Sequence, residues 1–467
     1  MTHTSNRQRP PRFAGRTARH LCAVCNAFAL VWLGLLATAT ANETRLRLII
    51  ETDAGGDPDD EQSLVRFLLY ANEWDVEAII ANRPHARDGE NLNPERTGLG
   101  IVRRQLAAYR DCWPNLTKHD PRYPSAEQLE SRTLAGDDST ADAVDLIIRI
   151  VDREDPRPVW YSDWGTDVGA ARNNLRRALD RVLAERGPAG YAKFKRRLRL
   201  ASADAFGEHT RDIEPPFSLW VDTFRPELDG RRWYHRFSAL TATAGGFDIE
   251  RDARAGHGPL GALYPLNTTH RQKEGDSMTF LYLVPTGMND PQQPGWGSWG
   301  GRYGLNPQEA ARPYYWANQR DTWQGTTNRD NTLARWSEAL QNDFAARLDW
   351  CVAATYQQAN HRPRAVVNGD GTREILRLEV KSGDNVQLSA AGSSDPDGQT
   401  ITCNWFVYPE AGTLATPIEL TSTNGETTSF PAPAVSRPET VHLVLSVVDE
   451  GSPRLFTFRR VVITIQP

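Results

Sequence analysis

Short apolar runs alternate with amphipathic helical stretches along most of this chain, from Leu46 to about Asn360. A short apolar run is typical of a buried strand, and apolar residues three or four positions apart are typical of one helix face. A strand, a loop and a helix repeated in this order favour a mostly parallel α/β sheet wrapped by helices. The predicted strands cover residues 45–50, 76–81, 158–162 and 198–202, and the predicted helices cover residues 63–71, 100–109, 141–152 and 168–186.

The pattern changes after His361, where Arg362-Pro363-Arg364 interrupts the last helix. Proline has no amide hydrogen and clashes in a helix interior, and no helical period returns beyond it. About 100 residues of short alternating strands separated by turns indicate an all-β, immunoglobulin-like sandwich. The predicted strands of this part cover residues 386–390, 400–408, 441–449 and 456–465.

The N-terminal segment has the pattern of a signal peptide. A basic stretch at residues 7–19 carries five arginines and no acidic residue, and an apolar run follows from Ala27 to Ala37. Ala39-Thr40-Ala41 has the small-x-small pattern of a cleavage site. An apolar run of this length is too short to span a bilayer. We therefore expect a secreted protein, extracellular or periplasmic, with a signal peptide at 1–41, an α/β domain at 42–360 and a sandwich at 361–467.

Charge and cysteine content narrow the classes of partner. The formal net charge is −5, and loss of a leader with five arginines leaves the mature chain near −10. Such a surface has no basic field to collect phosphates, so neither nucleic acid nor membrane is expected as a partner of the mature protein. Cys112, Cys351 and Cys403 remain after cleavage, too few and too widely spaced for a disulfide framework or a zinc site. One bridge is possible in an oxidising compartment, but the sequence does not choose it.

The most informative segment is the acidic loop, residues 51–61, between the first predicted strand and its helix. Six of its eleven residues are acidic, and two glycines allow a tight turn. Close carboxylates repel each other unless they are solvated or share a cation. Hard oxygen ligands favour Ca²⁺ or Mg²⁺. The alternative is a solvated turn in which Asp59 or Asp60 caps the helix.

This strand, loop and helix resemble the signature of the nucleoside hydrolases. The resemblance implies that Asp53 binds Ca²⁺ and acts as the general base, and that Asp60 is a bidentate calcium ligand. It also implies that Asp59 holds sugar hydroxyls. The pattern departs from the family at Glu51, which stands where an Asp is usual, and at Asp57-Pro58, which looks like an insertion.

Three further segments are similar to that family. Asn82, after the second strand, would contact the sugar, although it could be an ordinary turn residue. Thr166 would ligate calcium through its main-chain oxygen, and Asp276 would close the metal shell or cap a helix. Gly275 replaces the His that is a candidate acid for the leaving base, and His257 is a weak substitute. The stretch 202–209 lacks the base-recognition Glu-Phe-Asn, so recognition of a purine or pyrimidine does not follow.

Over almost the whole mature chain, the sequence is similar to secreted bacterial cellulose-binding proteins that combine a nucleoside-hydrolase-like domain with a β-sandwich. This resemblance implies a secreted, calcium-dependent hydrolase of glycosyl bonds that acts on a sugar-containing substrate and binds cellulose or a related polysaccharide. A nucleoside-like small molecule is the other expected partner. The alternative is a non-catalytic cellulose-binding protein with a structural metal loop. The matching phrases lie at residues 52–63, 257–261, 296–303, 341–347, 393–398 and 405.

Tryptophans are a second candidate for carbohydrate contact. The chain has 14, and Trp296 and Trp299 lie in a glycine-rich loop. Flat aromatic faces stack on sugar rings, so we expect these two to bind substrate. The alternative is that they are large core residues, as we expect for Trp405 in a central strand.

Overall fold

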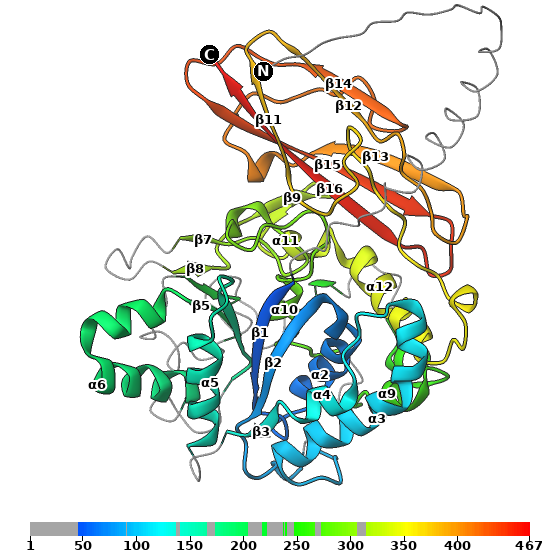
Figure 1. The fold of residues 1–467 in the computed structure, drawn as a ribbon. Coiled ribbons are helices and arrows are strands. Elements are labelled where there is room, and N and C mark those ends of the chain that lie inside the picture. The colour runs from blue at the N-terminus through cyan, green and yellow to red at the C-terminus, as the bar shows by residue number, and fades with distance from the viewer. Residues whose placement is uncertain are drawn as a thin grey trace, which may run out of the picture. The chain divides into compact units, whose positions relative to one another are not determined.

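The computed structural model describes residues 45–89, 91–136, 141–165, 173–203, 217–221, 237, 239–240, 247–266, 272–305 and 314–467. The predicted signal peptide lies outside these ranges. Residues Arg45–Pro467 form one compact unit (Figure 1). Among the described residues, no helix has the length and apolar character needed to cross a membrane.

An eight-stranded sheet forms the centre of the first part, in the order β3-β2-β1-β4-β5-β6-β8-β7. All neighbouring strands are parallel except the pair β7 and β8. This arrangement confirms the predicted mostly parallel sheet. The strands are β1 (Leu46–Thr52), β2 (Trp74–Ala81), β3 (Thr133–Ala135), β4 (Val159–Asp163), β5 (Leu198–Ser202), β6 (Ser218–Trp220), β7 (Gly304–Leu305) and β8 (Tyr315–Trp316).

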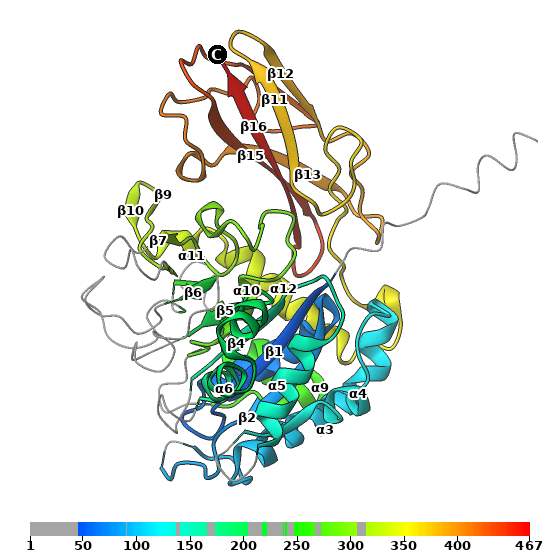
Figure 2. The same ribbon diagram turned by 60° about the vertical axis from the view of Figure 1, so that its left-hand side comes forward.

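Both faces of this sheet are covered, which explains why most residues of its strands are apolar. Within β1, Leu48 and Ile50 face one hydrophobic cluster while Ile49 faces the other. Figure 1 shows α5 and α6 on one side of the sheet and α2, α3, α9 and α12 on the other, and Figure 2 shows the same layers after rotation. The helices are α2 (Asp59–Leu69), α3 (Gly98–His119), α4 (Ala126–Glu130), α5 (Asp142–Asp152), α6 (Asn174–Lys195), α9 (Gly258–Ala262), α10 (Ser277–Leu281), α11 (Asn331–Ala334) and α12 (Ser337–Trp350).

Helix α6 differs from its prediction. It continues to Lys195 through a kink at Gly187, where φ is 64°, and it begins beyond residues 166–172, which are not described. Short 3₁₀ or π turns lie at Ala71–Glu73, Glu250–Arg254, Pro294–Trp296, Tyr356–Gln358 and Pro409–Ala411, and β9 (Asp321–Trp323) and β10 (Thr326–Asn328) form a hairpin.

The C-terminal part is a sandwich of a four-stranded sheet, β11-β16-β15-β13, and a two-stranded sheet, β12-β14. The predicted all-β architecture is confirmed. Its alternation did not reveal β11, which pairs parallel to β16, or β14. The strands are β11 (Leu376–Lys381), β12 (Asn385–Ser389), β13 (Ile401–Val407), β14 (Thr427–Pro431), β15 (Glu439–Asp449) and β16 (Phe456–Gln466).

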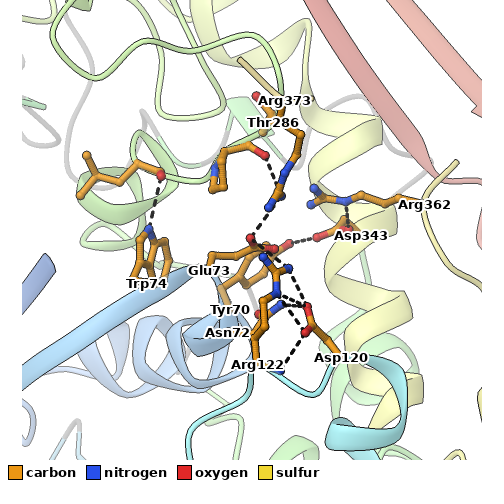
Figure 3. A network of polar contacts seen from close by, with 12 residues as sticks. Tyr70, Asn72, Glu73, Trp74, Asp120, Arg122, Thr286, Asp343, Arg362 and Arg373 are labelled. Carbon is orange, nitrogen blue, oxygen red and sulfur yellow. Dashed lines mark hydrogen bonds and ion pairs between the residues drawn. The ribbon is translucent and has the colours of Figure 1, made fainter. Parts of the chain in front are cut away.

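The sandwich and the α/β part share one hydrophobic core. Val444 and Phe458, on the face of β15 and β16 that lies away from the sandwich interior, belong to the same cluster as the helices of the α/β part. Trp336 packs edge-on against Phe458, with ring centroids 5.6 Å apart. Polar contacts reinforce the junction, and Figure 3 shows the arginines that surround Glu73 there. The sandwich is therefore packed as part of the fold rather than carried on a free linker.

Candidate functional site

The acidic loop lies at the carboxyl edge of the parallel sheet. It connects the end of β1, at Thr52, to the start of α2, at Asp59. The neighbouring strands β2 and β4 end at Ala81 and Asp163 on the same edge. Ligands of open α/β sheets bind outside this edge, because the loops of adjacent strands converge there.

Three carboxylates meet at this edge. One oxygen each of Asp59, Asp60 and Asp276 lies within 4.8 Å of the other two, and all three side chains are buried. Asp276, at the start of α10, has an Oδ2 atom that is buried and accepts no hydrogen bond. Neither Pro58, the N-cap of α2, nor Asp276, the N-cap of α10, makes a side-chain capping bond. Helix capping therefore does not account for the Asp276 carboxylate. We call the three carboxylates the acidic group.

Main-chain and hydroxyl donors hold the acidic group in place. Asp60 Oδ1 accepts hydrogen bonds from Thr52 Oγ1 at 2.6 Å and from the amide of Asp53 at 3.1 Å. Asp59 Oδ1 accepts from the amide of Asp60 at 2.9 Å. The turn that makes this possible includes Gly55, whose φ of 100° favours glycine. The sequence-local contacts thus fix two of the three carboxylates.

Burial and mutual repulsion raise the pKa values of all three carboxyls well above their usual range. For Asp59 the largest cause after burial is Asp276, and for Asp60 and Asp276 it is Asp53. Buried like charges are costly unless a cation is shared or a proton is taken up. An all-oxygen set with an unpartnered buried carboxylate oxygen fits a hard divalent cation such as Ca²⁺.

Asp53 lies beside the acidic group, close enough for its charge to act on Asp60 and Asp276, and it is also paired with Arg83. Arg83 Nη2 is 2.9 Å from Asp53 Oδ2, and Arg83 Nε donates to the main-chain oxygen of Asp53 at 2.9 Å. The third member of the acidic group is Asp59, which the sequence assigned to sugar hydroxyls. Arg83 was missed, although it directly follows Asn82 at the end of β2.

Asn82 and Glu51 form a buried bridge next to the loop. Glu51 Oε1 accepts from Asn82 Nδ2 at 2.9 Å and from Asn174 Nδ2 at 2.8 Å, and Tyr161 donates to Oε2. Burial raises the pKa of Glu51. Asn82 Oδ1 is buried and has no hydrogen-bond donor. Glu51 therefore works as a support for Asn82, a role that spacing alone did not indicate.

Two predicted positions cannot be placed at the acidic group. Thr166 lies outside the described residues, as does most of the stretch expected at the base-recognition position. His257 Nδ1 is 3.1 Å from Asp349, near the end of α12, and this pairing raises its pKa. No contact among the described residues connects His257 to the acidic group.

The prediction that Trp299 stacks on substrate is wrong for this structure. Trp299 is fully buried, and the guanidinium of Arg362 lies 4.7 Å from its ring centre. Trp296 is half-buried, with Arg377 4.8 Å from its ring centre and His442 against its edge. The glycine-rich loop packs against the sandwich, because its glycines allow the two parts to approach closely. Trp405 is buried in the sandwich core.

Two family descriptions match the chain. Residues 47–303 match the nucleoside hydrolase-like domain of cellulose-binding Sde182. Residues 385–465 match the C-terminal domain of the cellulose-binding protein Sde0182. A search of curated proteins finds no match.

The solved structures include a nucleoside hydrolase-related hypothetical protein from Saccharophagus degradans, which is described as associated with carbohydrate metabolism. It is 30% identical, with a TM-score of 0.72, and the match covers 91% of this chain and 100% of that chain. Two other solved structures match only weakly. A Photobacterium 2,6-sialyltransferase is 14% identical, with a TM-score of 0.16, and the match covers 20% of this chain and 17% of that chain. The PKD domain of the KIAA 1837 protein is 18% identical, with a TM-score of 0.17, and the match covers 23% of this chain and 91% of that chain. Because one family description covers more than half of the chain and the Saccharophagus structure is matched along its whole length, the chain belongs to the family of cellulose-binding proteins with an Sde182-type, nucleoside hydrolase-like domain.

Proposed function

We propose that this protein is a secreted, calcium-dependent hydrolase of glycosyl bonds that acts on a sugar-containing substrate and also binds cellulose or a related polysaccharide. The observation that carries the proposal is the acidic group, in which Asp59, Asp60 and Asp276 bring three buried carboxylates together at the ligand-binding edge of the sheet. A bound calcium ion would compensate their charge and polarise a water molecule.

The acidic group would hold the ion through Asp60, Asp276 and Asp59, with the main-chain oxygen of Thr166 as a further proposed ligand. The unpartnered Oδ2 of Asp276 supports this assignment, because a buried carboxylate oxygen without a donor is costly. Asp59 can serve the ion or a sugar hydroxyl with the same oxygens.

Asp53 is the proposed general base. Cleavage of a glycosyl bond passes through a state with oxocarbenium character, and a carboxylate must accept the proton of the attacking water. Arg83 orients the Asp53 carboxylate through Nη2, and the side chain of Asp53 remains partly exposed, so that it can reach a substrate. Asn82 Oδ1 is a free acceptor for a sugar hydroxyl.

If the sandwich binds polysaccharide, the binding surface and the acidic group lie at opposite ends of the parallel sheet. The acidic group lies at the carboxyl end of β2, and the sandwich contacts Glu73, just before the amino end of that strand. A strand of eight residues separates the two ends by about 25 Å. We propose that binding to cellulose anchors the protein, while the acidic group acts on a separate sugar.

The competing function is a non-catalytic cellulose-binding protein with a structural metal loop. One observation favours it: the Asp53 carboxylate is already paired with Arg83, at 2.9 Å. Under this alternative Arg83 neutralises Asp53, and the ion only completes the fold of the loop.

The deciding experiment compares the full mature chain with its Asp53→Asn variant. Both are tested on a panel of nucleosides and oligosaccharides with calcium and with chelator, and both are tested for pull-down by insoluble cellulose. Calcium-dependent turnover that disappears in the variant while cellulose binding stays supports the hydrolase. Calcium binding and cellulose binding without turnover of any substrate support the alternative. Absence of calcium binding in titration calorimetry overturns both.

The tail cannot be tested as an isolated fragment. Val444 and Phe458 of the sandwich share a core with the α/β part, so a fragment would expose this surface. Cellulose binding is better assigned with surface substitutions in the full chain.

A further inference from the structure

Two of the three cysteines outside the predicted leader lie side by side. Cys112 is on α3, Cys351 directly follows α12, and both are buried. The two thiols are close enough for each to shift the pKa of the other, lowering that of Cys112 and raising that of Cys351. Asn115, one turn beyond Cys112, donates to the main-chain oxygen of Cys351 at 2.9 Å, although 236 residues separate the two.

Packing around the two sulfurs keeps them together. A Cβ atom built on Gly258 would lie 3.6 Å from Cys112 Sγ and 3.6 Å from Cys351 Cβ, so the first residue of α9 lies next to both side chains. Cys351 Sγ also donates to the main-chain oxygen of Arg347 at 3.7 Å. The pair is thus enclosed by α3, α9 and α12, with no metal-ligating histidine in contact with either sulfur among the described residues.

We propose that Cys112 and Cys351 form a disulfide bond in the mature protein. The spacing of the three cysteines in the sequence did not show which two of them could form a bridge. This proposal goes beyond the proposed hydrolysis and depends only on the secretion part of that function, because structural disulfides persist in oxidising compartments.

The chemistry balances with an external disulfide as the oxidant. The thiolate of one cysteine attacks a disulfide of a thiol–disulfide exchange protein or of oxidised glutathione and releases one thiol. The second cysteine then attacks the mixed disulfide, releases the second thiol and closes the Cys112–Cys351 bond. Two S–H bonds are lost, two protons leave, and the oxidant takes up two electrons.

The bond would fix the start of the segment, residues 352–361, that connects α12 to the sandwich. Beyond Cys112 on α3, His119 lies 3.1 Å from the main-chain oxygen of Ala353 and 2.9 Å from His361. His361 in turn lies 3.0 Å from Asp397 in the sandwich. A covalent tie between α3 and the end of α12 would hold one end of this chain of contacts. Cys403, half-buried on β13 in the sandwich, stays a free thiol.

Thiol counting on the mature chain tests the proposal. The protein is exported to the bacterial periplasm or refolded with oxidised and reduced glutathione, unfolded without reductant, alkylated and weighed. We expect one alkylated cysteine before reduction and three after it. Peptide mapping should find the peptides of Cys112 and Cys351 joined. Three alkylated cysteines without reduction, or a bond that involves Cys403, would overturn the proposal.

Matched variants separate the bond from unrelated effects. Cys403→Ser should show no alkylation before reduction and two sites after it, and its thermal midpoint should fall by several degrees when reductant is added. Cys112→Ser should show two sites in both states, and reductant should leave its midpoint unchanged. An equal response of both variants to reductant would contradict the proposal. These counts are independent of turnover, so a failure of the hydrolase would not alter them.

Discussion

The guanidinium of Arg373 lies 3.2 Å from the carboxylate of Glu73, although 300 residues separate the two in the chain. Glu73 directly precedes β2, and Arg373 leads into β11 of the sandwich. Arg347 of α12 contacts the same carboxylate at 2.7 Å. Burial raises the pKa of Glu73, but Arg373, Arg347 and Arg122 outweigh it and hold the pKa well below its usual range. One carboxylate thus joins three distant segments.

Replacement of Glu73 by Gln should lower the free energy of unfolding by about 3 kcal/mol at pH 7, because it leaves the buried Arg347 and the half-buried Arg373 without this counter-charge. The contribution of a carboxylate with a depressed pKa is present at neutral pH and is lost as the pH falls through its folded value. The difference from wild type should therefore narrow in acid. Urea denaturation at several pH values measures it. Glu185→Gln, in an exposed ion pair with Arg181, is the control and should change stability little.

The Asp60→Asn substitution should stabilise the protein without calcium and destabilise it, relative to wild type, with calcium. Asn keeps an Oδ1 acceptor for Thr52 and the amide of Asp53, but it removes one of the buried like charges. With chelator the variant should be more stable than wild type, because the pKa of Asp60 is raised by burial of its charge and by repulsion from the neighbouring carboxylates. With calcium the wild type should gain about 2.7 kcal/mol at one hundred times its dissociation constant, and the variant much less.

Thermal unfolding with calcium and with chelator measures the stability difference between the Asp60→Asn variant and the wild type in both conditions. Without calcium, the destabilisation of the wild type by its buried carboxylates should shrink as the pH falls. A carboxyl whose pKa is raised in the folded state takes up its proton at a higher pH than it does in the unfolded chain. Asp88→Asn, an exposed position, is the control. Equal effects of Asp60→Asn in both buffers would contradict calcium binding at the acidic group.

Gly287→Ala should destabilise the junction. Gly287 has a φ of 81°, and a Cβ atom there would meet the main-chain oxygen of Phe458 at 1.9 Å. The contact on β16 must then open, so we expect a loss of roughly 2–4 kcal/mol. Gly325→Ala, in the β9–β10 turn, is the matched control. Its φ is 77° but no atom lies within 4 Å of the added Cβ, so only the backbone strain of about 1 kcal/mol should appear. Equal losses in guanidinium denaturation would exclude the steric explanation.

His442 should make stability fall in acid. Burial, with Arg460 and Arg377 nearby, lowers its pKa to about 3, and Arg460 Nη1 donates to His442 Nδ1 at 3.0 Å. The folded protein keeps the imidazole neutral, while the unfolded chain protonates it below a pKa of about 6.5. Unfolding therefore takes up one proton between these values, and stability falls by up to about 1.4 kcal/mol per pH unit.

His442→Gln retains an acceptor for Arg460 and cannot titrate. Its unfolding free energy should depend on pH with a slope smaller by about one proton, as measured by urea denaturation between about pH 4 and 6. His85→Gln, at an exposed position, controls for histidine replacement in general. An unchanged slope in His442→Gln would show that this imidazole is not held neutral.

Local pattern predicted much of the fold. The apolar runs placed β1, β2, β4 and β5 within a few residues, because a strand buried on both faces is mostly apolar. The acidic loop was also recognisable from local sequence, since six of its eleven residues are acidic and close carboxylates repel each other unless they are solvated or share a cation. Short strands such as β11 and β14 were missed, because their residues are only partly apolar and their pairing is decided by distant partners.

The sequence by itself determined the longer strands of the α/β part, the order of the two parts and the candidate residues, because these depend on neighbours along the chain. Only the tertiary structure decided that Asp276 meets Asp59 and Asp60, that Arg83 takes the carboxylate of Asp53, and that Trp299 is covered by Arg362. It also decided that Cys351 lies against Cys112 and not against Cys403. Each of these contacts except those within the acidic loop joins residues about 30 to more than 200 positions apart. Such contacts follow from how strands and helices pack, which no local periodicity encodes.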